Sequence, residues 1–172
     1  TATFSPWNFP LYLLAKKVSA ALAAGCTVIS RPPQETPGCT GELFRALADA
    51  GIPNGVAQLV HGKASMVSKQ LLDSRVIRKV SFTGSVPVGK ELMKMAADGM
   101  KRITMELGGH APVLIFDDCD LEKTLDMVVP QKFRNAGQVC VSPTRFYVQS
   151  GIYDAFIKGF AERTAKVKVG NG

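Results

Sequence analysis

A cysteine-containing segment near the end of the sequence could form a nucleophilic site. It reads FRNAGQVC over residues 133–140 and places Cys140 after a glycine-containing turn, between an expected helix and an expected strand. At such a junction the sulfur and the backbone N–H of the same residue can face one cleft. A thiol that attacks a carbonyl carbon needs both groups, because the N–H donates to the oxyanion that forms. The alternative is a buried cysteine that packs as a small hydrophobe.

A second candidate segment joins an expected strand to an expected helix. It reads FTGSVPVG over residues 82–89 and places Ser85 between Gly84 and Gly89. A helix N-terminus has free N–H groups and the positive end of the helix dipole, so it suits the diphosphate of a dinucleotide. The spacing differs from the usual GxGxxG, and an ordinary strand-to-helix turn stays open as the alternative.

Two polar side chains could assist a thiol. Glu106, in MELGG over residues 105–109, ends an expected strand ahead of two glycines and could act as a general base. An isolated glutamate at a strand end can equally be a solvated carboxylate. Asn8, in PWNFP over residues 6–10, carries an amide group that can donate two N–H bonds to an oxyanion. The alternative for Asn8 is an Asx turn.

The elements that must position these residues alternate along the chain. Apolar and β-branched runs predict strands or extended segments at 1–8, 26–30, 56–60, 76–82, 102–106, 112–116 and 144–149. Longer runs predict helices at 11–24, 40–50, 63–72, 88–97, 121–135 and 152–166, and the prolines predict a loop at 31–37. This alternation is typical of an α/β fold with a mainly parallel sheet, in which ligands bind at the carboxyl ends of the strands. The candidates at expected strand ends are Asn8, Arg31, Gly84, Glu106 and Cys140.

Composition narrows the classes of function. Of the 172 residues, 46% are hydrophobic and 20% are charged, the balance of an ordinary globular protein. No apolar run approaches the ~20 residues that a membrane span needs. The net charge of +7 comes from Lys and Arg residues spread along the chain, which argues against a nucleic-acid arm. The charge fits either a solvated basic surface or attraction of anionic ligands.

The residues that could hold a metal ion or form disulfides are few and scattered. They are Cys26, Cys39, Cys119, Cys140, His61 and His110. No two cysteines have CxxC spacing, so the pattern argues against a zinc site and against a disulfide framework. Free thiols fit a reducing, cytoplasmic setting.

Together the motifs resemble those of the aldehyde dehydrogenase superfamily. In chain order they are PWNFP, RPPQETP, FTGSxxxG, ELGG and GQVC, and the similarity covers essentially the whole chain. The resemblance implies a Rossmann-like, mainly parallel sheet flanked by helices, followed by the start of a second α/β domain. It places an incomplete NAD(P)-binding domain at 1–109 and the incomplete beginning of a catalytic domain at 110–172. Family members are longer, so we expect an internal piece that lacks the later Glu-x-Phe motif and is inactive alone.

The resemblance also implies roles for single residues. Cys140 is expected to be the nucleophile, Glu106 to activate the water that hydrolyses a thioester, and Asn8 to help hold the oxyanion. The residues expected to bind the cofactor are Ser5, Pro6, Trp7, Arg31, Gln34, Phe82, Gly84, Ser85, Gly89 and Leu107. No metal is expected.

The expected substrate is a small aldehyde. The segment KFRNAGQVCVSPTRF over 132–146 is most similar to succinate-semialdehyde and α-ketoglutarate-semialdehyde dehydrogenases. Arg134 and the net positive charge would suit a distal carboxylate. We expect no nucleic-acid or membrane partner, and a homo-oligomer. Two alternatives stay open: a CoA-acylating dehydrogenase, which would not need Glu106 as a base, and a non-catalytic binding or structural protein. The intact Cys140, Glu106 and Asn8 argue against the second.

The loop RPPQETP over 31–37 bears on the choice between NADP and NAD. The family usually has Lys at the position of Arg31, and its NAD-preferring members often have Glu at the position of Gln34. Gln34 lacks the charge that would repel a 2′-phosphate, and Arg31 offers a planar fork of donors that suits phosphate. We therefore expect NADP to be preferred over NAD. A register shift that placed Glu35 at the carboxylate position would reverse the preference, and Arg31 could instead meet only solvent.

Overall fold

The structure of the chain is a computed structural model that describes residues 1–171. Its internal contacts divide the chain into two compact units, Thr1–Gly108 and Gly109–Gly172. Within the described residues, no helix is both long enough and apolar enough to cross a membrane.

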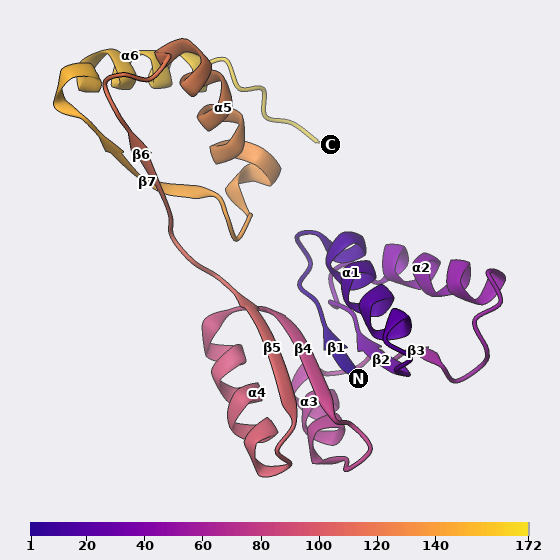
Figure 1. Ribbon diagram of the computed structural model, residues 1–172. Helices are drawn as coiled ribbons and strands as arrows, with labels where there is room; N and C mark the ends of the chain where they lie inside the picture. The colour runs from indigo at the N-terminus through magenta and orange to yellow at the C-terminus, as the bar shows by residue number, and fades with distance from the viewer. Residues whose placement is uncertain (172) are drawn as a thin grey trace. The chain divides into compact units, whose positions relative to one another are not determined.

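The first unit is built on one sheet of parallel strands (Figure 1). The strands are β1 (Ala2–Phe4), β2 (Val28–Arg31), β3 (Ala57–Leu59), β4 (Lys79–Gly84) and β5 (Arg102–Leu107), in the order β3-β2-β1-β4-β5. From β1 the chain steps outward to β2 and β3, and it then returns to β4 on the other side of β1. The direction of winding therefore changes between β1 and β4, where parallel α/β sheets commonly bind ligands. The predicted α/β fold with a mainly parallel sheet is confirmed.

Helices cover both faces of this sheet. They are α1 (Pro10–Ala23), α2 (Pro37–Asp49), α3 (Ala64–Asp73) and α4 (Val86–Asp98). Val28 packs into a cluster with the α1 residues Leu14 and Val18. The next residue, Ile29, packs against a different cluster that holds Leu72 of α3 and Leu92 of α4. Successive strand residues point to opposite faces, so α1 and α2 cover one face and α3 and α4 cover the other (Figure 1).

Several predicted boundaries were wrong. Three helices begin earlier than predicted, because Pro10, Pro37 and Pro87 lie in their first turns. Proline is tolerated there because the first N–H groups of a helix have no intrahelical partner. The strand predicted from Val76 begins only at Lys79, and the Val76 side chain is exposed.

The second unit has a small parallel sheet of two strands, β6 (Ala111–Ile115) and β7 (Pro143–Val148). They are joined through α5 (Leu121–Phe133) and the 3₁₀ turn η1 (Arg134–Gly137), and the 3₁₀ turn η2 (Ser150–Ile152) leads to α6 (Tyr153–Thr164). The core of the unit contains Ile115, Leu125, Val128 and Phe156. An apolar interface between helices and sheet therefore holds this unit together.

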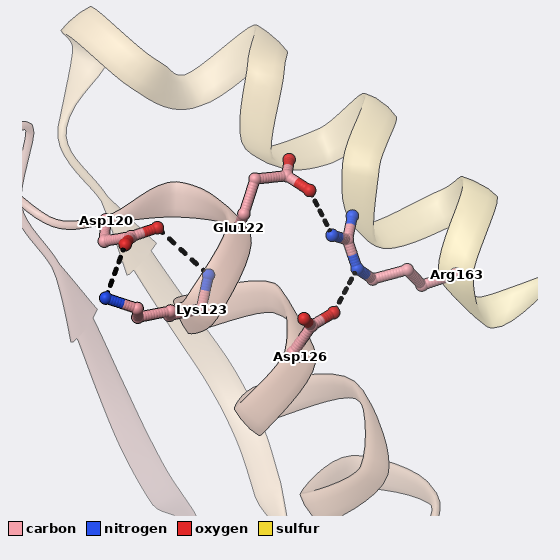
Figure 2. Close-up of polar contacts among 5 residues, drawn as sticks. All are labelled: Asp120, Glu122, Lys123, Asp126 and Arg163. Atoms are coloured by element: carbon pink, nitrogen blue, oxygen red, sulfur yellow. Dashed lines mark hydrogen bonds and ion pairs between the residues drawn. The ribbon is translucent and has the colours of Figure 1, made fainter.

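Polar contacts at the surface connect α5 with α6 (Figure 2). The Arg163 guanidinium donates to Glu122 at 2.6 Å and to Asp126 at 2.9 Å. At the start of α5, Asp120 accepts a hydrogen bond from the backbone N–H of Lys123, and this capping bond lowers the pKa of the Asp120 carboxyl below its ordinary value. The carboxylates are exposed, so these contacts orient the helices more than they stabilise them.

Candidate functional site

The segment that follows β1 contains the first group of candidate residues. Ser5 is buried, and the proline that follows it favours an extended backbone at this position. The Trp7 side chain is 45% exposed. The side-chain oxygen of Asn8 accepts a hydrogen bond from the backbone N–H of Phe9 at 3.2 Å. This local contact uses the acceptor of the amide group, whereas oxyanion binding would use its nitrogen.

Four of the predicted cofactor residues pack together where β4 meets α4. A Cβ atom on Gly84 would lie 2.5 Å from Cζ of Phe82, and one on Gly89 would lie 2.7 Å from Cδ2 of Leu107. Gly84 also pairs with Leu107 across β4 and β5. Both glycines are therefore needed for close packing of the Phe82 and Leu107 side chains, a reason that the sequence pattern did not indicate.

Ser85 stands at the N-cap of α4 and is exposed. Its backbone is extended, and its side chain makes no capping hydrogen bond to the helix. The helix has no acidic residue in its first turn. The N–H groups and positive dipole end of α4, together with the Ser85 hydroxyl, form an arrangement that suits an anion.

Lys17 is a polar residue close to the end of β4, and it was not predicted from the sequence. Its Nζ atom donates a hydrogen bond of 2.6 Å to Oγ1 of Thr83, and Thr83 pairs with Glu106 across β4 and β5. Burial, followed by the charge of Lys16, lowers the pKa of Lys17 below its ordinary value, while the Glu106 carboxylate acts in the opposite direction. The sequence did contain an indication of this position. Lys17 follows Leu14 by about one helical turn, so its side chain lies toward the buried face of α1.

The loop after β2 holds Arg31 in a defined position. Its Nη2 atom donates to the carbonyl oxygen of Gly62 at 3.2 Å, while its Nε atom is buried without a hydrogen-bond partner among the described residues. The expectation that Arg31 could meet only solvent is therefore wrong. Gln34 and Glu35 are exposed.

Cys140 lies in the second unit and is exposed. The helix predicted to reach Asn135 ends at Phe133, and Asn135, Ala136 and Gly137 then adopt left-handed conformations with φ of 51°, 55° and 76°. Left-handed backbone is strained for residues other than glycine. This turn reverses the chain ahead of Cys140.

Hydrogen bonds hold the segment around Cys140. The N–H of Gln138 donates to the carbonyl of Asn135, and the N–H of Ser142 donates to the carbonyl of Val139, both at 3.0 Å. The buried Ser142 hydroxyl also donates to the carbonyl of Lys132. Cys140 precedes β7, as predicted from its place between an expected helix and an expected strand.

The other cysteines and possible metal ligands form no comparable site. All four cysteines are free; Cys26 is exposed, as Cys140 is, while Cys39 and Cys119 are partly buried. Among residues 1–171, no group of three or more histidine, cysteine or acidic side chains is arranged to hold a metal ion.

Comparisons with known proteins match the whole chain to one family. The model of the aldehyde dehydrogenase family matches residues 1–172. 4-(Hydroxymethyl)benzenesulfonate dehydrogenase TsaD1 of Comamonas testosteroni is 48% identical over 171 residues, covering 99% of this chain and 36% of that protein. The succinate-semialdehyde dehydrogenase [NADP(+)] GabD of Escherichia coli K12 is 42% identical over 172 residues, covering 100% of this chain and 36% of that protein.

A solved structure shows the same backbone. The crystal structure of an aldehyde dehydrogenase from Brucella melitensis biovar abortus 2308 is 48% identical and superposes with a TM-score of 0.98, covering 100% of this chain and 36% of that one. The chain belongs to the aldehyde dehydrogenase family. It spans about a third of the length of the curated relatives that it matches.

Proposed function

We propose that the natural protein carrying this chain oxidises an aldehyde to a carboxylate with NAD(P)+ as the acceptor. The observation that carries the proposal is that Asn8, Glu106 and Cys140 are all intact, each within its family motif and in the family's order. In this proposal, residues 1–109 bind the cofactor and residues 110–172 supply the nucleophile.

The reaction proceeds in two stages. The Cys140 thiolate forms a C–S bond to the aldehyde carbon, and the carbonyl oxygen becomes an oxyanion that the Asn8 amide and the Cys140 N–H hold by hydrogen bonds. The C–H bond then breaks with loss of a hydride, which leaves a thioester on Cys140. Glu106 next takes a proton from water as the water attacks the thioester carbon, and the C–S bond breaks to give the free thiolate and the carboxylic acid, which loses its remaining proton to solvent as the carboxylate.

NAD(P)+, when bound, would accept this hydride. The residues of the first unit fit a dinucleotide at three points. Ser85 and the N-terminus of α4 suit the diphosphate, and the close packing at Gly84 and Gly89 fixes the turn that leads into that helix. The buried Nε of Arg31, which lacks a partner among the described residues, is a donor that suits an anionic group of the cofactor.

NADP is the proposed preferred cofactor. The exposed Gln34 has no charge that would repel a 2′-phosphate, and Arg31 provides a guanidinium held at the end of β2 by its bond to Gly62. The relative GabD is named for NADP(+). If Glu35 instead occupied the position next to the ribose, NAD would be preferred.

The proposed substrate is an aldehyde with a second, anionic group. The relative TsaD1 is named for a sulfonate, and the relative GabD is named for succinate semialdehyde. The net charge of +7 favours the approach of an anionic substrate. Arg134, close to Cys140 in the sequence, is the residue proposed to attract that group.

Steady-state kinetics of the full natural protein test this proposal. Succinate semialdehyde should be oxidised with a higher kcat/KM than butanal, a neutral aldehyde of the same chain length, and NADP+ should exceed NAD+. Cys140→Ala should abolish activity, while Cys26→Ala, which removes the other exposed thiol, should retain it. An NAD+ preference of about tenfold or more, ~1.4 kcal/mol in transition-state binding, would refute the choice of NADP. Product formation that requires CoA would favour the acylating alternative.

A further inference from the structure

The proposed nucleophile lies at the tip of a tight turn that ends at Ser142. The N–H of Ser142 donates to the carbonyl of Val139 at 3.0 Å, so Cys140 and Val141 are the central residues of a β-turn. Both of these central residues are exposed. Among the described residues, no hydrogen bond uses the backbone N–H of Cys140. The thiol and the N–H proposed to hold the oxyanion therefore depend on the turn for their position.

Ser142 fastens this turn to the helix that precedes it. Its hydroxyl donates to the carbonyl of Lys132 at 3.1 Å, which joins residues ten positions apart in the sequence. Lys132 lies in the last turn of α5, where carbonyl groups have no N–H partner within the helix. Ser142 is 4% exposed, so bulk water does not compete for this bond. One hydroxyl therefore caps the end of α5 and holds the turn that carries Cys140.

The chain on each side of the turn is confined. Pro143 follows Ser142, is buried, and pairs with Ala111 at the start of β7. A residue that precedes proline favours extended backbone. On the other side, a Cβ atom on Gly137 would lie 3.4 Å from the same Lys132 carbonyl oxygen, so the chain folds closely over the end of α5. Cys140 lies between these two confined points.

We propose that Ser142 is a positioning residue for the reaction at Cys140, because its bond to Lys132 fixes the turn that presents the thiolate and the N–H to one carbonyl group. This inference rests on the proposed function, in which Cys140 attacks an aldehyde. A donor stabilises an oxyanion best when it already points to the place where the charge develops. Ser142 is buried, so it acts through the turn and not through contact with the substrate.

Two reactions of Cys140 in the full natural protein test this positioning. The first turnover, measured as NADPH formed from succinate semialdehyde and NADP+, needs the thiolate and the oxyanion donor together. Alkylation by iodoacetamide needs the thiolate but forms no oxyanion. Ser142→Ala should slow the first turnover by about tenfold or more, since loss of a whole oxyanion donor costs about 100-fold or more. It should leave the alkylation rate of Cys140 within about twofold of the wild type, because that rate follows the thiolate fraction.

Two further variants separate positioning from stability. Ser142→Thr keeps the hydroxyl and should recover most of the first-turnover rate. Thr40→Val is the matched control, because the buried Thr40 hydroxyl also donates to a backbone carbonyl, that of Pro37, but within α2 of the first unit. This control should lower the Tm, as Ser142→Ala does, and leave the first turnover at the wild-type rate.

Three results would overturn the inference alone. They are a first turnover of Ser142→Ala at the wild-type rate, an equal slowing of its turnover and alkylation, and a Ser142→Thr variant as slow as Ser142→Ala. If the wild type formed no NADPH or NADH from any aldehyde tested, the proposed function itself would fail.

Discussion

Gly84→Ala is a direct test of the packing at the turn between β4 and α4. The added Cβ would lie 2.5 Å from Cζ of Phe82 and 3.0 Å from its Cε2, against about 3.5–4.0 Å for a relaxed carbon contact. The Phe82 ring is only 7% exposed and belongs to the core beneath α3 and α4. It cannot swing into solvent, so the contact must be relieved by movement of the ring or of the β4 backbone.

The expected cost is that of overpacking a core, about 1–3 kcal/mol. Alanine restricts the unfolded chain more than glycine does, which offsets this by about 0.4–1 kcal/mol. From the middle of each range the net loss is ~1.3 kcal/mol, or a fall in Tm of roughly 3–5 °C for a domain of 150–250 residues. Differential scanning fluorimetry of the full natural protein measures this shift.

A double-mutant cycle identifies the cause. Phe82→Leu deletes the ring atoms that the new Cβ would meet, so Gly84→Ala should cost much less in that background, with a coupling of ~1 kcal/mol or more. Gly41→Ala is the control, since Gly41 lies inside α2 with open space around the added Cβ and should gain stability from the better helix propensity of alanine. Effects of Gly84→Ala and Phe82→Leu that add to within ~0.5 kcal/mol would refute the packing argument.

Two further predictions concern Lys17 and the cysteines. The pKa of Lys17 is lowered in the folded state, so the unfolded chain binds more protons between that lowered pKa and 10.5, and stability should rise with pH across this window. Lys17→Met removes the titrating group, so the difference in Tm between this variant and the wild type should change between about pH 8.5 and pH 11. A difference in Tm that stays constant over this range would contradict a lowered pKa of Lys17 in the folded state. Limited iodoacetamide labelling should modify Cys140 faster than Cys26, which is also exposed, and equal labelling of both thiols would count against a special environment at Cys140.

The order of elements was predictable because each depends on short-range sequence. β-Branched runs and alanine-rich runs alternate, and glycines such as Gly25 and Gly51 end the helices, so local propensity agrees with the final fold. Boundaries were less predictable where a proline could serve either a loop or a first helical turn, as at Pro37. Tertiary packing decides whether such a proline lies in a loop or in the first turn of a helix, and the local sequence carries no information about that packing.

Residue types indicated the chemistry of the site, but its packing was not predictable. The glycines of the FTGSVPVG segment were interpreted as a phosphate turn, whereas the structure shows that the Phe82 and Leu107 side chains also require them. That requirement depends on side-chain positions in two strands. The role of Lys17 depends likewise on a contact from α1 to β4. The left-handed turn before Cys140 stands where the end of a helix was predicted, and left-handed backbone at residues other than glycine is not indicated by local propensity.

The central claim is that Cys140 carries the acyl group and that Glu106 activates the water that releases it. It is tested most directly with the Glu106→Gln variant of the full natural protein, mixed with succinate semialdehyde and NADP+ and quenched in acid. The prediction is a burst of about one NADPH per site, as a single turnover without hydrolysis requires, with the mass of a succinyl group on the peptide that contains Cys140. Loss of the burst, or a succinyl group found on Cys26 or on no cysteine, would contradict the account.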